Sequence, residues 1–294
     1  MLIAFAIAGF ILSGFLGAMV LWASSGVSTK DLATIMKDPQ YAGTLRLVQA
    51  VSVIITMFLP AWLTATILNR KPFRLLGFRK DADVSQIILV IGVMFVALFV
   101  AGAFGSLNKD IVDAVGLKGW SEKLEKSYNE QVKTMLDMDS TGGYLISLLV
   151  MAFLPAVCEE VLFRGGLQNF LTRATRNPWL SITIVSFLFS LVHFSVYGFL
   201  PRLFLGVILG VIFHYGKNIW LCITGHFFNN ALAVSSVYFF MKQGKPMKDA
   251  LEQDISLAYW GFLAIPLIIW LLLTLKKTSA KTQLNDSETL TDGI

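Results

Sequence analysis

The sequence is poor in charged residues, which make up 15% of its 294 residues, and poor in cysteine, of which it has two. Soluble domains carry about 25% charged residues, so this composition argues against a water-soluble enzyme. Cys158 and Cys222 both lie in apolar runs, and the chain encodes neither a disulfide framework nor a CxxC metal site. Because 55% of the residues are hydrophobic and the mean hydropathy is +0.68, the composition predicts an integral membrane protein.

Several motifs of familiar enzymes are also missing. The chain has no GxGxxG or Walker loop, no GxSxG serine-hydrolase motif, no HExxH zinc-protease motif and no internal repeat. The net charge of +5 is only a weak sign of nucleic-acid binding. In a membrane protein, an excess of Lys and Arg more often reflects topology and contacts with anionic headgroups. We therefore expect membrane lipid, and no nucleic acid, among the partners.

Apolar runs of about 20 residues, long enough to cross a bilayer, recur along the chain. They predict an all-α bundle of about eight transmembrane helices in one domain, residues 1–275, followed by a polar, disordered tail, residues 276–294. The first run lacks a basic n-region and a small-x-small cleavage site, so we interpret it as a retained helix. The expected spans are Leu2–Ala23, Leu47–Leu68, Ile87–Leu107, Tyr144–Phe163, Leu180–Tyr197, Phe199–Tyr215, Ile219–Met241 and Ala258–Leu275.

Lysine and arginine in short loops indicate the orientation of a membrane protein. The most basic short loop follows the second span and contains Arg70, Lys71, Arg74, Arg79 and Lys80. We expect this loop to face the cytoplasm, which would place both termini and the tail on the same side. The long loop on the opposite side, residues 108–143, carries five lysines of its own, together with several acidic residues.

The same long loop has an amphipathic pattern. Its larger apolar residues recur every four positions, at Trp120, Leu124, Tyr128 and Val132. This spacing predicts a helix that lies at the membrane interface. Its role is either to cap the bundle or to control access of a substrate.

Ionisable residues inside membrane spans are costly, so each is a functional hypothesis by default. Glu159 and Glu160 lie in the apolar context LPAVCEEVLFRGG, and all three histidines of the chain, His193, His214 and His226, lie in or at the edge of predicted spans. We treat the two glutamates, two of the histidines and the nearby asparagines as the candidate site.

Helical spacing separates these residues by face. Glu160 and Arg164 are four residues apart and can pair along one helix face, either as a helix-stabilising ion pair or as part of a site. Glu159 is rotated by about 100° from Glu160 and is free for another role, or for a polar contact between helices. His226 and Asn230 are also four apart and can project into one pocket, whereas Asn229 is turned away from that line.

The two helices that carry Glu159 and His193 form a predicted antiparallel hairpin. If its turn is centred on Arg176, Glu159 lies 17 residues before the centre and His193 lies 17 residues after it. The two side chains should therefore face each other at one depth. His226 follows Lys217 by only nine residues, so it reaches that depth only if the turn at Lys217 lies inside the bundle or its helix is tilted.

Two kinds of chemistry suit these residues. A buried glutamate can act as a general base on water, while neutral His and Asn donate hydrogen bonds to a developing oxyanion. Alternatively, Glu159, His193 and His226 form a His₂Glu set that suits Zn²⁺ or another divalent metal. Both routes end in attack of water on an acyl carbon. Cys158 and Cys222 are more simply interpreted as buried core residues than as nucleophiles.

Three segments resemble the motifs of a known family. EEVLFR (Glu159–Arg164) fits EExxxR, FSLVH (Phe189–His193) fits FxxxH, and HFFNN (His226–Asn230) fits HxxxN. These are the motifs of the CAAX prenyl endopeptidase type within the wider CPBP family of intramembrane proteases, also called the Abi family. The resemblance covers about residues 143–240. It implies an eight-helix membrane fold and an endopeptidase whose site is reached from the cytoplasmic side.

The resemblance also implies roles for individual residues. Glu159 would activate water, His193 and His226 would contact the reacting groups, and Asn230 would help to hold the oxyanion. Metal-dependent and metal-free mechanisms are both argued for this family. The short loops are similar to those of prokaryotic members, which implies a prokaryotic plasma membrane.

By the same resemblance, Glu160 and Arg164 are supporting residues. The implied partner is a peptide or protein substrate, lipidated or embedded in the membrane. His214 matches no motif, and we interpret it as structural.

Two functions of other classes remain as alternatives: a non-enzymatic membrane scaffold or immunity-type protein, and a small proton-coupled transporter, which would also place Glu and His inside the bundle. A scaffold would keep its function after Glu159→Ala, and a transporter would lose uptake rather than proteolysis. Every motif position is filled in this chain, which argues against a degenerate scaffold.

Overall fold

The computed structural model describes residues 1–25, 35, 38–136, 138, 140–244 and 258–291, and within them it contains helices and no strand, so the predicted all-α class is confirmed. The α-helices are α1 (Leu2–Ser25), α3 (Ala42–Val53), α4 (Leu59–Leu68), α5 (Pro72–Leu75), α6 (Val84–Ala114), α7 (Lys118–Met135), α8 (Thr141–Ser147), α9 (Leu154–Glu160), α10 (Asn169–Thr175), α11 (Pro178–Leu191), α12 (Phe199–Gly216), α13 (Ile219–Lys242) and α15 (Ile265–Thr291). The π-helical segments are η3 (Ile54–Phe58), η4 (Leu148–Phe153) and η5 (Val161–Gln168), and the 3₁₀ segments are η2 (Pro39–Tyr41) and η6 (Ala258–Ala264).

Two long helices of the bundle contain proline without breaking. Pro60 follows η3 and Pro155 follows η4, so each proline comes directly after a wider π turn. A proline has no N–H to donate, and its ring needs room beside the carbonyl four residues earlier. A π turn accommodates both the missing hydrogen bond and the bulk of the proline ring. The chain therefore runs as one helix from Ala42 to Leu68 and as another from Thr141 to Thr175.

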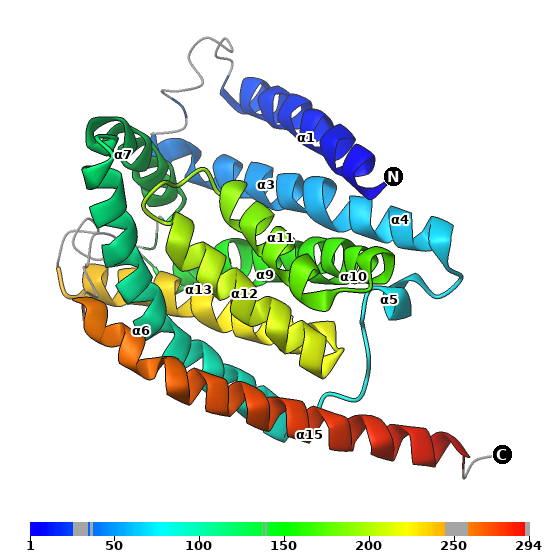
Figure 1. Cartoon of the computed structure of the whole chain (residues 1–294). Helices are drawn as coiled ribbons and strands as arrows, with labels where there is room; N and C mark the ends of the chain where they lie inside the picture. Colours follow the sequence, from blue (N-terminus) through cyan, green and yellow to red (C-terminus); the bar gives the residue numbers. More distant parts are fainter. Residues whose placement is uncertain (26–34, 36–37, 137, 139, 245–257, 292–294) are drawn as a thin grey trace.

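Six helices within the described residues are long and apolar enough to cross a membrane (Figure 1). They are Leu2–Ser24, Ala42–Leu68, Val84–Ala114, Thr141–Thr175, Phe199–Gly216 and Tyr259–Thr282. The other two expected spans are also helical, but α11 has only 14 residues, and α13 carries His226, Asn229 and Asn230 in its first half. The expected number of eight is therefore approximate, because α11 is shorter than the six long helices and α13 is more polar.

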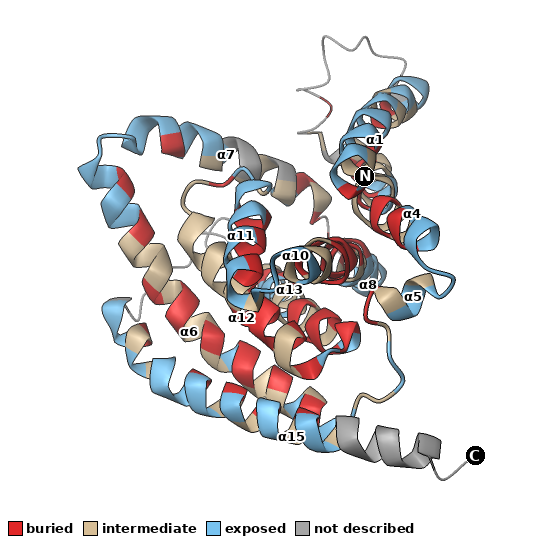
Figure 2. Ribbon diagram, turned by 45° about the vertical axis from the view of Figure 1, so that its right-hand side comes forward, coloured by how far each residue is buried: buried red, intermediate tan, exposed pale blue. Residues whose placement is uncertain are grey.

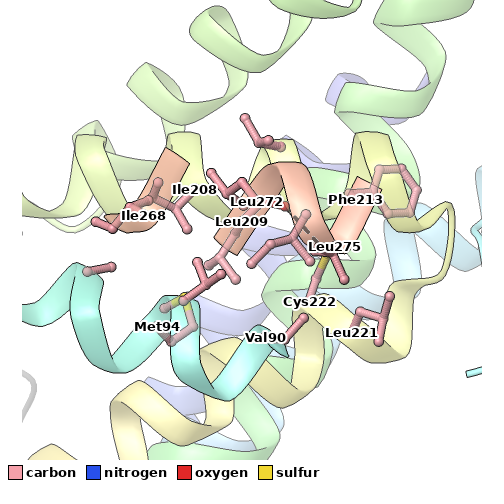
Figure 3. Packing of buried hydrophobic residues seen from close by; sticks show 14 of the residues in the cluster. Val90, Met94, Ile208, Leu209, Phe213, Leu221, Cys222, Ile268, Leu272 and Leu275 are labelled. Carbon is pink, nitrogen blue, oxygen red and sulfur yellow. Dashed lines mark hydrogen bonds between the residues drawn. The ribbon is translucent and has the colours of Figure 1, made fainter. Parts of the chain in front are cut away.

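The main core lies where α6, α12, α13 and α15 meet (Figure 3). Val90 and Met94 from α6 pack there with Leu209 from α12 and with Cys222 from α13. Cys222 is a free, fully buried thiol, as expected for a core residue.

The outer sides of α1 and α15 are exposed (Figure 2). The exposed face of α1 is apolar, with Phe10 at 66% and Phe15 at 68%. Such faces suit contact with lipid.

The turn between α12 and α13 packs against the chain that follows α5. Ile219 is fully buried, and its N–H donates to the carbonyl of Gly77 at 2.9 Å. Asn218 caps α13 by accepting from Trp220 N at 3.1 Å, and its Nδ2 donates to the carbonyl of Arg79 at 3.3 Å. These contacts fix where α13 begins, and His226 lies at the depth of Glu159, with its Nε2 atom 3.8 Å from Glu159 Oε2.

The segment after residue 275, which the sequence predicts to be a polar tail, starts within α15. Helix α15 continues to Thr291. Gln86, at the start of α6, donates from Nε2 to Ser279 Oγ at 2.8 Å, and Ser279 is fully buried. This contact holds α15 against the bundle just beyond the apolar run.

Helix α7 confirms the helix expected in the long loop between the third and fourth spans. Trp120 is 57% exposed, whereas Val132 packs against Leu136 and neighbouring residues of a small core cluster. The side chain of Tyr128 lies outside the described residues. The helix lies across one end of the bundle, beside the end of α6 (Figure 1).

Candidate active site

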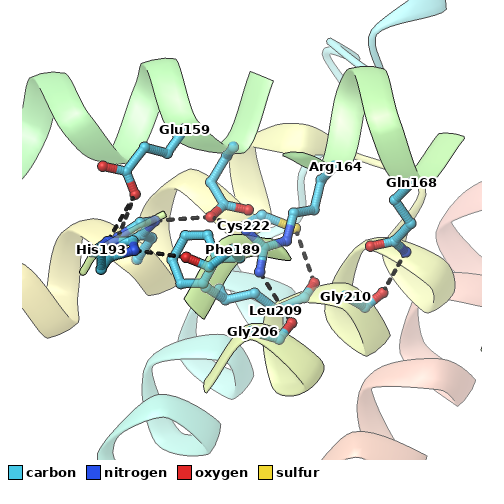
Figure 4. A network of polar contacts seen from close by, with 11 residues as sticks. Glu159, Arg164, Gln168, Phe189, His193, Gly206, Leu209, Gly210 and Cys222 are labelled. Atoms are coloured by element: carbon cyan, nitrogen blue, oxygen red, sulfur yellow. Dashed lines mark hydrogen bonds and ion pairs between the residues drawn. The ribbon is translucent and has the colours of Figure 1, made fainter. Parts of the chain in front are cut away.

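Glu159 and two histidines come together inside the bundle (Figure 4). Glu159 Oε2 lies 3.8 Å from His193 Nε2 and 3.8 Å from His226 Nε2. Glu159 is 9% exposed and His226 is 6% exposed, so the carboxylate and this imidazole are buried. Three elements supply the three side chains, namely the end of α9, the segment after α11, and α13.

The hairpin that brings Glu159 to His193 has the predicted turn. Helix α10 ends at Arg176, which adopts a left-handed conformation with φ 55°, and Asn177 then caps α11 by accepting from Leu180 N at 3.1 Å. Pro178 occupies the first turn of α11, where its missing N–H costs nothing. The prediction that Glu159 and His193 face each other across this hairpin is confirmed by their contact.

The Nδ1 atom of each imidazole is held by an acceptor. His193 Nδ1 lies 2.7 Å from the Phe189 carbonyl oxygen, and His226 Nδ1 lies 2.8 Å from Glu160 Oε1. Because a carbonyl oxygen and a carboxylate can only accept, each Nδ1 carries the hydrogen. In a neutral imidazole, Nε2 then carries a lone pair. Two Nε2 lone pairs and one carboxylate oxygen of Glu159 therefore converge on one small space.

Glu160 serves a different purpose from Glu159. Its Oε1 accepts from Arg164 Nη1 at 2.8 Å as well as from His226 Nδ1, and Arg164 Nη2 donates to the Gly206 carbonyl at 3.0 Å. Glu160 and Arg164 are both fully buried. The predicted i,i+4 pair is confirmed, and it also orients His226, which the spacing of the sequence does not reveal.

Phe189 packs under both imidazoles. Its ring centroid lies 4.9 Å from that of His193 and 5.7 Å from that of His226, and the Arg164 guanidinium lies 4.8 Å above the same ring. Phe189 is four residues before His193, one helical turn away. It is the first residue of the FSLVH segment, so that motif contained a signal for this contact, although sequence reasoning assigned Phe189 no role.

Asn230 lies one turn beyond His226 and is half-buried. Its Oδ1 accepts from Asn229 Nδ2 at 3.3 Å, which leaves the amide nitrogen of Asn230 as a donor. In the described part of the chain, no direct hydrogen bond joins Asn230 to Glu159 or to either imidazole. The structure thus places Asn230 near the group but does not bring it into contact with the other three residues.

The third histidine lies elsewhere. His214 is near the other end of α12, where its Nδ1 lies 3.4 Å from Lys217 Nζ and its ring centroid lies 5.8 Å from that of Trp179. It has no contact with the group around Glu159, in agreement with a structural role.

The spacing of Glu159, His193 and His226 is wider than that of ideal tetrahedral Zn²⁺ ligands. Tetrahedral Zn²⁺ holds N and O donors at about 2.0–2.2 Å, which places neighbouring donor atoms about 3.4 Å apart. Both contacts of Glu159 Oε2 are wider, at 3.8 Å. Within the residues that the structure describes, no group of three His, Cys, Asp or Glu side chains is arranged to hold a metal ion.

The site is closed on one side and exposed on the other. Toward the end of the bundle that carries the α10–α11 turn, Arg164 is fully buried and Gln168 is 3% exposed. The side chain of His193 is 23% exposed, and Phe194 beside it is 78% exposed. The exposed side is therefore the side near α7.

The basic loop with Arg70 and Lys71 lies at the closed end, since Asn169 of α10 donates to the Leu75 carbonyl at 2.7 Å. The basic loop and the exposed side of His193 thus lie toward opposite ends of the bundle. That the basic loop is cytoplasmic and that the site is reached from the cytoplasm both stay predictions.

The comparison with protein families gives a match for residues 141–232, to a family described as Type II CAAX prenyl endopeptidase Rce1-like. This range contains Glu159, Phe189, His193, His226 and Asn230, and thus all three motifs. The comparison with curated proteins and the comparison with solved structures each gave no match. The resemblance inferred from the three motifs is confirmed over this range.

Proposed function

We propose that this chain, whose residues 141–232 belong to the Rce1-like family of type II CAAX prenyl endopeptidases, is an intramembrane endopeptidase in which Glu159 activates the attacking water. The observation that carries the proposal is the position of Glu159 Oε2, which lies 3.8 Å from the Nε2 atoms of both His193 and His226 in the interior of the bundle.

The hydrogen-bonding character of this group suits a water nucleophile. Glu159 Oε2 and the two Nε2 atoms are all acceptors when the imidazoles are neutral. A water molecule has two hydrogens to donate, and donation to Glu159 and to one imidazole would direct an oxygen lone pair at the substrate. As the water attacks the carbonyl carbon, its proton passes to Glu159, which acts as general base.

The tetrahedral intermediate then needs donors for its oxyanion and a proton for its leaving group. The amide nitrogen of Asn230 is free to donate to the oxyanion. Glu159 returns the proton to the amine nitrogen as the C–N bond breaks, so the glutamate ends the cycle ionised. Glu160 and Arg164 act by holding His226 in the orientation that these steps need.

The proposal extends to the substrate class and the location. We propose a peptide or protein substrate that is lipidated or embedded in the membrane, and a chain that resides in a prokaryotic plasma membrane, surrounded by lipid. The partial exposure of His193 and the exposure of Phe194 support entry of the substrate from the α7 side.

The experiment is cleavage of a reporter peptide library by the purified protein in liposomes. Wild type is compared with Glu159→Gln, which keeps the size of the side chain but removes the base, and with Glu122→Gln, an exposed position on α7. We expect Glu159→Gln to lose activity by at least a hundredfold, since general-base catalysis contributes about 10²- to 10⁴-fold, and Glu122→Gln to keep it.

Equal cleavage by wild type and Glu159→Gln would refute the proposal. A chelator added to the active wild type tests metal dependence separately. If no library member is cleaved, a proton-coupled uptake assay on the same liposomes tests the transporter alternative, and a function that survives Glu159→Ala would identify a scaffold.

A further inference from the structure

His193 does not lie on a helix. It belongs to the segment of residues 192–198 that joins α11 to α12. Phe194 in this segment has φ 49°, a conformation that a bulky residue seldom adopts without support from its surroundings. Phe194 is 78% exposed, so packing of its own side chain does not supply that support. The position of His193 therefore depends on what holds the neighbouring residues.

Two polar side chains from other elements hold this segment. Asn108, near the end of α6, donates from Nδ2 to the Val196 carbonyl at 2.7 Å. Ser195 donates from Oγ to the carboxylate of Glu125 on α7, with 3.1 Å to each of its two oxygens. Asn108 is 6% exposed and Ser195 is 5% exposed, so both contacts are shielded from solvent.

The Ser195 hydroxyl connects Glu125 to the backbone of the segment. Ser195 Oγ also accepts from the N–H of Gly198 at 3.0 Å, so one hydroxyl both closes the turn and bonds to α7. Gly198 packs closely against two side chains, since a Cβ there would meet the Arg202 guanidinium and Ser195 Oγ. A shift of Ser195 would therefore shift the whole segment, including His193 two residues earlier.

We propose that Glu125 is a positioning residue for the reaction: through Ser195, α7 holds the His193 segment so that His193 Nε2 faces Glu159. This proposal rests on the proposed function. It deepens the role of α7, which acts on the geometry of the site and not only as a cap on the bundle. Glu125 is half-buried on an amphipathic helix, and its carboxylate accepts from a buried hydroxyl 70 residues away in the sequence.

The kinetic test compares substitutions on both sides of the contact. We expect Glu125→Ala and Ser195→Ala each to lower kcat on the order of ten- to a hundredfold, with a small change in KM, since small misplacements of a catalytic group have effects of this size. Ser195→Thr keeps the hydroxyl and should retain most of the activity. Glu122→Ala, on the same helix, removes an exposed carboxylate and serves as the matched control.

A second arm separates positioning from general stability. In a His193→Ala background, Glu125→Ala should lower the residual activity no further, because the residue that it positions is gone. A full additional loss in that background, or an effect of Glu125→Ala no larger than that of Glu122→Ala, overturns the proposal.

A third arm does not depend on activity. A spin label at Phe194→Cys reports the mobility of the segment, and the native thiols Cys158 and Cys222 are buried at 2% and 0% exposure and so are shielded from the label. We expect the label to become more mobile with Glu125→Ala but not with Glu122→Ala. Unchanged mobility overturns the positioning role, whereas absence of proteolysis in a protein that shows the mobility change refutes the proposed function alone.

Discussion

His226 Nδ1 lies 2.8 Å from Glu160 Oε1, although the two residues are 66 positions apart. The same oxygen atom pairs with Arg164 at 2.8 Å. One carboxylate oxygen therefore joins a buried ion pair to an imidazole that faces Glu159, and the second glutamate of the EE pair links the stability of the bundle to the orientation of the site.

This link predicts that stability and activity can be separated. Glu160→Ala leaves the fully buried Arg164 without its partner, and breaking a buried pair in this way costs about 3–5 kcal/mol. Adding Arg164→Met removes the stranded charge, so the double variant should recover much of the lost stability. It should stay poorly active, because His226 still lacks its acceptor at Nδ1. Thermal unfolding in detergent and reporter cleavage measure the two effects, and a double variant that regains full activity would contradict the role of Glu160.

A second prediction concerns Gly77, whose carbonyl accepts from the N–H of Ile219 at the start of α13. Gly77 has φ 91°, which favours glycine, and a Cβ there would lie 2.9 Å from the Phe213 ring. We expect Gly77→Ala to lower the free energy of unfolding by about 1–2 kcal/mol or more. Gly92→Ala is the matched control, because Gly92 lies within α6 with no atom within 4 Å of the added Cβ.

In a helix interior, Ala is favoured over Gly by up to about 1 kcal/mol. Gly92→Ala should therefore leave the melting temperature unchanged or raise it. Equal melting temperatures for Gly77→Ala and Gly92→Ala would contradict the close packing around Gly77 at the start of α13.

A third prediction concerns topology. Single cysteines at Arg70 and at Lys118, both exposed, mark the basic loop and the α7 end of the bundle. A thiol reagent that does not cross membranes should label Arg70→Cys and Lys118→Cys from opposite sides of intact vesicles. Labelling of both from one side would contradict the arrangement in which the exposed side of the site and the basic loop lie on opposite faces. The side that labels Lys118→Cys also shows from which compartment the substrate enters.

Local spacing determined a large part of this protein. The all-α class follows from long apolar runs, and the Glu160–Arg164 pair follows from the helical period. The encounter of Glu159 with His193 follows from equal distances to the turn at Arg176. Each of these relationships depends only on positions within one helix or one hairpin, where the rise and rotation per residue are constant.

The tertiary structure decided the rest. The contact of Glu160 with His226 depends on how far α13 is set into the bundle, and that depth depends on the turn buried against Gly77. The hydrogen bond between Ser195 and Glu125 likewise joins two segments whose relative position no helical spacing determines. Helices that are apolar on nearly every face, as in a membrane, give no single stripe to mark which side meets which neighbour. Their relative rotation and depth are set by the packing of side chains from several helices at once, and no pattern within one segment contains that information.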